Sequence, residues 1–380
     1  MSTTEKFRAK KGLEGVIFDT TTVSHVVPEE KSLFYRGYPV HELADRCTFE
    51  EVAYLLLHGE LPTAAQLTQF SQIERSSREL PTELYEVISR LPLDGHPMDA
   101  VRTAVSFLGM LPEFSGVESA ESAVRKGVLL LAKIPTVIAA VRRRQQNEAL
   151  VGPDNQLSLS ENFFQMCFGQ IPEPEVVDAF DGALTLYAEH GFNASTFTGR
   201  VIVSTQSDLC AAVTGAIGAL KGNLHGGANE AVMHMLLEIG TADRAQAWID
   251  NALANKAKVM GFGHRLYRLG DSRVPTMSHY RSRLARLRDG ERWEAISAVL
   301  EETMIGRKNI YPNLDFPAGP VYYLMGFDIP LFTPIFVIAR VVGWTAHVAE
   351  QLSENRLVRP SGDYIGPAPR AVTPIEERSS

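Results

Sequence analysis

The chain has 380 residues, of which 45% are hydrophobic and 22% charged, so it can bury a large core in about two domains. Its formal net charge of −8 disfavours nucleic acid as a partner, because neutralising phosphates requires a basic face, but it still allows small anionic substrates in a local basic pocket. Three widely spaced cysteines without a CxxC pair and a polar N-terminus without a signal peptide predict a cytoplasmic protein with no disulfide framework.

Helical signals dominate the chain. Residues 48–51 (TFEE) form a capping box ahead of apolar residues at helical spacing, and residues 63–66 (TAAQ) form a second one. Pro97 suits the first position of another helix, and Thr333-Pro334 reads as the N-cap and first residue of the helix that contains Arg340. These signals predict a mainly α protein.

Strand and loop signals are fewer. Residues 15–24 (GVIFDTTTVS) are the best strand candidate, with residues 34–38 (FYRGY) as a possible hairpin partner. Two polar stretches, 115–122 and 145–160, are typical of loops. No repeat near 34 or 40 residues is present in the sequence, which disfavours a helical solenoid.

Two further segments carry packing signals. Residues 211–222 place small side chains at i, i+4 and i+7, which permits close helix packing within the chain or across a dimer, or indicates an ordinary core helix. The longest apolar stretch, residues 328–350, is interrupted by Arg340 and His347. Its longest uncharged run, Ile329–Ala339, has 11 residues, whereas a bilayer span needs roughly 20, so we expect a buried helix and no membrane association.

Two histidines stand in glycine-rich settings, His225 in LHGGAN and His264 in GFGHR, and Asp315 follows in NLDF. Glycines let backbone or ligand approach an imidazole closely. Two such histidines and a carboxylate can remove a proton from carbon and stabilise the charge that develops on oxygen. The pattern is typical of carbon–carbon condensation through an enol, although glycine-rich turns also contain ordinary histidines. We expect surface or structural roles for five other histidines, His25, His41, His58, His234 and His279.

Arginines supply a second part of the candidate site. Arg340 lies in an apolar run and requires a carboxylate from the protein or from a substrate. Arg273 and Arg359 offer further planar guanidinium groups, which can bind a carboxylate through two hydrogen bonds. Three arginines near two histidines would fit a dicarboxylate that bears a carbonyl, while a structural salt bridge stays the alternative for each arginine. His190, in a polar cluster, could bind a ligand or serve the cap of the next helix.

Taken as a set, the segments 224–230 (LHGGANE), 261–265 (GFGHR) and 313–316 (NLDF) resemble the citrate synthase family. The resemblance extends over nearly the whole chain, from Tyr35 to Pro360. Within the family, the chain is most similar to bacterial 2-methylcitrate synthases, particularly the actinobacterial type. The segments that carry this finer resemblance are 187–198, 311–316 and 332–350.

The resemblance implies a nearly all-α fold in an obligate homodimer. It has a large domain of residues 1–222 and 330–380 and an inserted small domain of residues 223–329. The chain begins close to the catalytic fold and lacks the long N-terminal β-rich extension of NADH-inhibited bacterial citrate synthases, which predicts no inhibition by NADH.

The resemblance also implies roles for individual residues. Asp315 would be the base, His225 would donate a hydrogen bond to the thioester oxygen, and His264 would polarise the ketone of oxaloacetate. Oxaloacetate would be held by His190, Arg273, Arg340 and Arg359, the last from the partner subunit. The segment that would contact CoA is Lys258, Val259, Met260, Gly261 and Phe262, with Arg268 near the CoA phosphates. No metal or redox cofactor is implied.

Two acyl donors remain open, propionyl-CoA for a 2-methylcitrate synthase and acetyl-CoA for a citrate synthase. They differ by one methylene, worth only about 1–3 kcal/mol in a pocket, so dual activity is compatible with the sequence. Subfamily resemblance favours propionyl-CoA. A catalytic zinc site is disfavoured because the sequence has no HExxH or similar ligand pair. A non-catalytic helical interaction protein would not explain arginine and histidine at these positions.

Overall fold

The computed structural model describes residues 10–267 and 269–378. Within them, 61% of the chain is helical and 3% is strand, which confirms the mainly α prediction. Arg268, which we expected near the CoA phosphates, lies outside the described residues.

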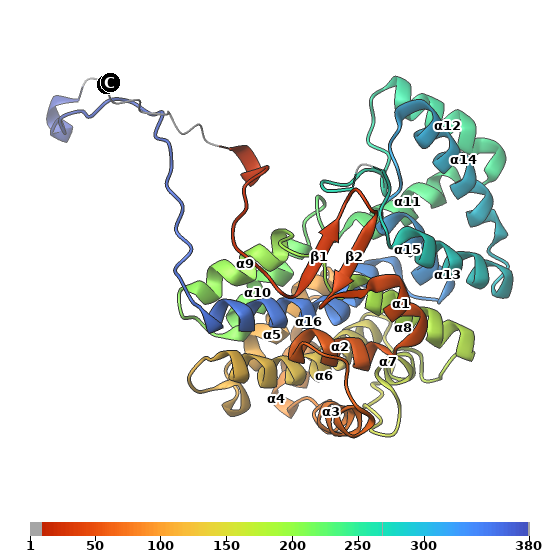
Figure 1. Cartoon of the computed structure of the whole chain (residues 1–380), viewed down its shortest axis with the longest axis horizontal. Coiled ribbons are helices and arrows are strands. Elements are labelled where there is room, and N and C mark those ends of the chain that lie inside the picture. The colour runs from red at the N-terminus through yellow and green to blue at the C-terminus, as the bar shows by residue number, and fades with distance from the viewer. Residues whose placement is uncertain (1–9, 268, 379–380) are drawn as a thin grey trace.

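Most of the helices form one large body (Figure 1). They are α1 (Val40–Arg46), α2 (Phe49–His58), α3 (Ala64–Ser76), α4 (Thr82–Arg90), α5 (Pro97–Leu108), α6 (Ala120–Gln145), α7 (Leu159–Phe168), α8 (Pro174–Tyr187), α9 (Ala194–Ser204), α10 (Leu209–Leu220) and α16 (Phe332–Ser353). A second group packs together beside this body, at the upper right of Figure 1. It contains α11 (Ala228–Ile239), α12 (Ala242–Ala254), α13 (Val274–Leu287), α14 (Glu291–Lys308) and α15 (Asp315–Leu324).

Helix starts follow the sequence signals closely. Both predicted capping boxes are present, at the N-termini of α2 and α3, and Pro97 is the first residue of α5. The prediction for α16 was wrong by two residues, because this helix begins at Phe332. The hydroxyl of Thr333 instead contacts the carboxylate of Glu230, and its backbone N–H donates to the same oxygen at 3.2 Å. A tertiary contact thus replaces the expected N-cap.

The strand prediction was largely wrong. The sheet is a small antiparallel one, β1 (Ser24–Val27), β2 (Ser32–Tyr35) and β3 (Tyr38–Pro39), in the order β1-β2-β3. Only Ser24 of the candidate 15–24 belongs to a strand, although the hairpin partner was correctly expected in β2 and β3. Ile17 is 90% exposed, so this β-branched segment has no apolar face against which to pair.

The loop predictions were close. Residues 146–158 connect α6 and α7 as expected. The loop at 115–122 ends earlier than predicted, because Ser119 caps α6 and the helix starts at Ala120. The serine-rich composition that suggested a loop here serves a helix N-terminus instead.

The predicted buried helix is α16, which packs against α2, α6, α8 and α9 in the middle of the large body (Figure 1). By length and composition the segment Ile329–Ser353 could cross a membrane, but 89% of its apolar window is buried inside the protein. This is the burial of a core helix, as predicted.

The small residues of α10 permit close packing within the chain. A Cβ on Gly215 would come within 2.3 Å of Cδ1 of Ile202 on α9, so a larger residue would require the end of the Ile202 side chain to move. The prediction of close helix packing is confirmed inside the chain, and its extension across a dimer stays a prediction.

Candidate active site

The loops that carry the predicted catalytic residues of the second helix group are joined to each other. The hydrogen bonds that join them run from Gly263 N–H to Tyr311 O (2.8 Å), from Asn313 N–H to Gly261 O (2.9 Å) and from Asn313 Nδ2 to Gly263 O (2.8 Å). His264 follows Gly263, and Asp315 lies two residues after Asn313. These three hydrogen bonds therefore hold His264 and Asp315 in a fixed position relative to each other. A Cβ on Gly261 would lie 2.7 Å from that of Phe316, and its φ is +79°, so glycine is required at this position.

Asp315 is the first residue of α15. The hydroxyl of Tyr187 donates to its Oδ1 at 2.8 Å, and its backbone N–H donates to Oδ1 of Asn313 at 3.1 Å. Burial raises the pKa of Asp315 to about 6, while the Tyr187 hydrogen bond and the charge of Arg273 oppose that rise. The carboxylate is therefore ionised at neutral pH with a pKa close to the working range, as suits a general base.

His264 is held in one tautomer by the backbone. Its Nδ1 accepts hydrogen bonds from the N–H groups of Leu266 (3.0 Å) and Tyr267 (3.1 Å), so its proton lies on Nε2. Burial lowers the pKa of His264 to about 4, with Arg273 lowering it further and Asp271 opposing. The ring is thus neutral at pH 7 and presents an N–H donor.

His225 contacts Ser195 on α9 of the large body, which orients its ring. Its Nε2 lies 2.9 Å from Oγ of Ser195, and this hydroxyl also accepts the indole N–H of Trp344 at 3.0 Å. Burial, followed by the charge of Arg340, lowers the pKa of His225 to about 4. This second imidazole is also neutral at pH 7.

His190 carries an unsatisfied buried nitrogen. The residue is 7% exposed, its ring centre lies 5.1 Å from that of His264, and its Nε2 has no hydrogen-bond partner among the described residues. Burial and the neighbouring Arg273 hold the pKa of His190 well below its usual value. A buried nitrogen without a partner costs free energy, so the arrangement is suited to a bound ligand.

Arg273 and Arg340 differ in their partners. Arg273 forms a two-point ion pair with Asp271, at 3.0 and 2.7 Å, so the salt-bridge alternative applies to it in this structure. Arg340 donates from Nε to the carbonyl of Tyr187 at 2.8 Å, with its guanidinium 4.7 Å from the Phe336 ring centre. Arg340 makes no ion pair among the described residues, which leaves its terminal nitrogens available to an anionic ligand.

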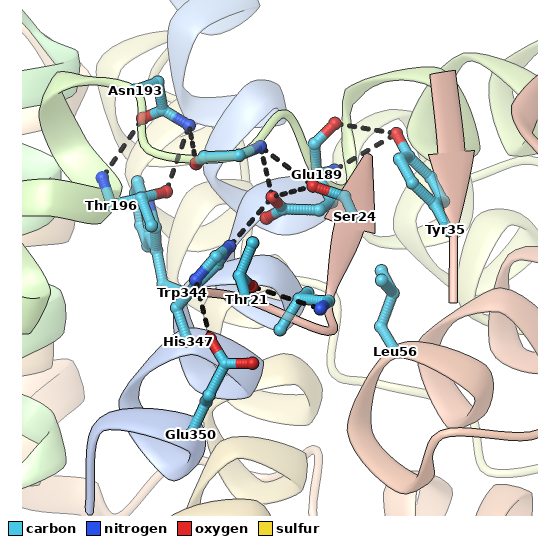
Figure 2. Close-up of polar contacts among 12 residues, drawn as sticks. Thr21, Ser24, Tyr35, Leu56, Glu189, Asn193, Thr196, Trp344, His347 and Glu350 are labelled. Atoms are coloured by element: carbon cyan, nitrogen blue, oxygen red, sulfur yellow. Dashed lines mark hydrogen bonds and ion pairs between the residues drawn. The ribbon is translucent and has the colours of Figure 1, made fainter. Parts of the chain in front are cut away.

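A buried polar network that the sequence analysis missed lies around Glu189, the residue before His190 (Figure 2). Glu189 accepts hydrogen bonds at Oε1 from the hydroxyl of Ser24 (2.9 Å) and from Nε2 of His347 (2.9 Å). His347 in turn lies 3.3 Å from Nη1 of Arg200, which also donates to Glu350 at 2.7 Å. The network joins β1, the turn that carries His190, and α16.

We expect His347→Leu to lower the free energy of unfolding by about 2–4 kcal/mol, because it leaves Glu189 buried with fewer partners. Urea denaturation followed by circular dichroism measures the change. The matched control is His234→Leu at an exposed position of α11, which should change stability by less than about 0.5 kcal/mol. Equal stability of the two variants would show that the Glu189 network contributes nothing.

The other predicted residues are less enclosed. In the CoA segment, Lys258 is exposed and Met260 is half-buried, whereas Val259 and Phe262 are buried, and CoA binding by this segment stays a prediction. Arg359 is exposed in the C-terminal tail, the segment after α16, and this tail leads away from the body in Figure 1. The histidines expected at the surface, His25, His41, His58, His234 and His279, are all exposed.

The chain belongs to the citrate synthase family, since the family described as "Citrate synthase, C-terminal domain" matches residues 12–361. It is 54% identical to a citrate synthase of Mycolicibacterium smegmatis, over 96% of this chain and 97% of the relative. It is also 54% identical to a 2-methylcitrate synthase of Mycobacterium tuberculosis, over 94% of this chain and 90% of the relative. The citrate synthase of Thermoplasma acidophilum, solved with carboxymethyl coenzyme A and oxaloacetate, matches with a TM-score of 0.92 at 32% identity, over 98% of this chain and all of that one.

Proposed function

We propose that the chain is a 2-methylcitrate synthase, which condenses propionyl-CoA with oxaloacetate and water to give 2-methylcitrate and CoA, with some activity toward acetyl-CoA. The observation that carries the chemistry is a buried carboxylate with a raised pKa on a loop that is hydrogen-bonded to the loop of the neutral His264, together with a second neutral imidazole at His225. The propionyl preference rests on relatives named 2-methylcitrate synthase at 48–54% identity.

The first step is removal of a proton from the carbon next to the thioester. Asp315 takes that proton, and His225 donates a hydrogen bond to the thioester oxygen as the enol forms. Because such a proton is only weakly acidic, the donor is as necessary as the base, and one donor of this kind contributes roughly 3–4 kcal/mol. Donation from Nδ1 of His225 requires that Nε2 be the acceptor nitrogen, and the backbone N–H of Ser195 donates to Nε2 at 3.4 Å.

The second step joins the enol carbon to the ketone carbon of oxaloacetate. His264 presents its Nε2 proton to the ketone oxygen and transfers it as the alkoxide develops. Arg340 and His190 hold the substrate through nitrogens that the protein leaves free. Water then cleaves the thioester, releasing CoA and the tricarboxylate.

The site is completed by a second copy of the chain in this proposal. Arg359 lies in an exposed tail, so a homodimer in which the tail reaches the neighbouring site would supply the remaining guanidinium. The helices α11–α15, within the proposed small domain 223–329, would close over the substrates and exclude water during condensation. We place the enzyme in the cytoplasm, as the cysteine pattern suggests.

Initial rates of CoA thiol release with oxaloacetate test the proposal, with propionyl-CoA and acetyl-CoA compared across concentrations. We expect kcat/KM to be higher for propionyl-CoA by about 10-fold, the effect of one methylene group in an apolar pocket. Such a preference would assign the enzyme to propionate breakdown. A preference for acetyl-CoA would make it a citrate synthase, and no release with either would contradict the proposal.

The proposed reaction uses no metal or redox cofactor. Every step above is assigned to side chains and to substrate atoms. Turnover measured after dialysis against EDTA should therefore equal that of the untreated enzyme. Activity that is lost in EDTA and restored by a divalent metal would refute this assignment.

A further inference from the structure

The contact that the proposed reaction does not yet explain is the hydrogen bond from Tyr187 to the catalytic base. Tyr187 is the last residue of α8 and is 1% exposed, so this 2.8 Å bond to Oδ1 of Asp315 is shielded from water. Oδ2 of Asp315 accepts no hydrogen bond among the described residues. One oxygen is therefore held and the other is left free.

We propose that Tyr187 is a positioning residue, whose hydroxyl fixes Oδ1 of Asp315 so that Oδ2 is the oxygen that receives the substrate proton. The inference rests on the proposed function of Asp315 as the base. The bond connects α8 in the large body to α15 in the second helix group. It therefore links the base to the large body, which also contains Arg340 on α16.

The backbone of Tyr187 contacts a different site residue, Arg340. Its carbonyl accepts the hydrogen bond from Nε of Arg340 at 2.8 Å. One residue thus contacts the base through its side chain and the substrate-binding arginine through its main chain. A side-chain substitution at Tyr187 leaves the second contact in place, so effects on the base and on oxaloacetate binding can be separated.

A purely structural role for Tyr187 is the competing explanation. Its ring packs against Phe336 with centres 4.2 Å apart and against Tyr322 at 6.3 Å. Phenylalanine would preserve both contacts at nearly the same volume. A packing role therefore predicts that Tyr187→Phe behaves like the native enzyme, whereas a positioning role predicts a changed base.

The chain offers a matched control in Tyr322, which lies on α15 with the base. It is fully buried, and its hydroxyl has no hydrogen-bond partner among the described residues. Tyr322→Phe also removes one buried phenolic oxygen, from a ring that packs against Tyr187, but it removes no hydrogen bond. It should leave the pH profile and kcat unchanged.

In Tyr187→Phe, the pKa of Asp315 should rise above its native value of about 6, because a hydrogen bond that favours the ionised form is lost. The acid limb of kcat against pH should move up by about one pH unit, and kcat on the plateau should fall about 10-fold. KM for oxaloacetate should stay within about 2-fold. An unmoved acid limb would overturn the positioning role whether or not kcat falls, because the loss of a hydrogen bond to the carboxylate must change its pKa.

The test separates this inference from the proposed function. Wild-type release of CoA with either acyl-CoA examines the function, and its absence would contradict the function alone. Carbon-13 NMR of aspartate carboxyl groups follows the titration of Asp315 without turnover, with Asp315→Asn assigning the signal. An equal titration midpoint in native enzyme and Tyr187→Phe would overturn the positioning role even if the enzyme is active.

Discussion

Replacing Asp315 by Asn should lower kcat by about 10³-fold, because the amide is isosteric but cannot take a proton from carbon. Oxaloacetate binding should persist, since its proposed contacts with His190 and Arg340 are untouched. Steady-state rates of CoA release and calorimetric titration with oxaloacetate measure the two quantities. The matched control is Asp289→Asn at an exposed site after α13, which should retain native kcat.

The same substitution should stabilise the folded protein. The folded-state pKa of Asp315 is raised from 3.8 to about 6, so native stability falls as pH rises from about 4 to about 6 and stays reduced above that range. Removing the buried charge should therefore increase the free energy of unfolding at pH 7.5 by about 1–3 kcal/mol. Urea denaturation at pH 7.5 and pH 4 measures it, and the gain should be absent at pH 4. Native activity in Asp315→Asn would refute the assigned base, and equal stability at pH 7.5 would refute its raised pKa.

Local sequence rules predicted the helices because the signals for helix ends act over a few residues. Thr48 and Thr63 satisfy backbone N–H groups within their own first turn, so the capping boxes could be located without tertiary information. The start of α16 at Phe332 depends on a distant partner, since Glu230 is 103 residues away from Thr333 in the chain. The sequence around Phe332 does not contain that information.

The candidate site shows the same division. His225, His264 and Asp315 could be singled out because their glycine-rich or family-like settings mark them in the sequence. Ser195, Tyr187 and Glu189 could not, since each acts through a neighbour that folding brings close. The polar cluster around His190 was the one sequence signal close to these three residues. It does not indicate which side chain contacts the base. Contacts separated by more than 100 residues, such as Tyr187 with Asp315, require the fold.

Replacing His225 by Gln should lower kcat by about 10²–10³-fold, the effect of losing one donor to a developing oxyanion. The loss should be equal at pH 6 and pH 8, because the pKa of His225 is lowered to about 4 and the ring is neutral throughout this range. KM for oxaloacetate should be little changed, which distinguishes this donor from Arg340. The matched control is His234→Gln, an exposed histidine on α11, which should keep native kcat.

A charged imidazolium at His225 would give a different result, because its contribution would fade as the ring deprotonates near pH 6.5, its ordinary value. The native enzyme would then lose activity between pH 6 and pH 8 while His225→Gln would not, so the two rates would converge. Parallel pH profiles support neutral hydrogen-bond donation, which agrees with the backbone N–H of Ser195 donating to Nε2 at 3.4 Å and with the burial of the ring. The enol is then stabilised without a full proton transfer, and Asp315 is the one group that must change its protonation state to form it.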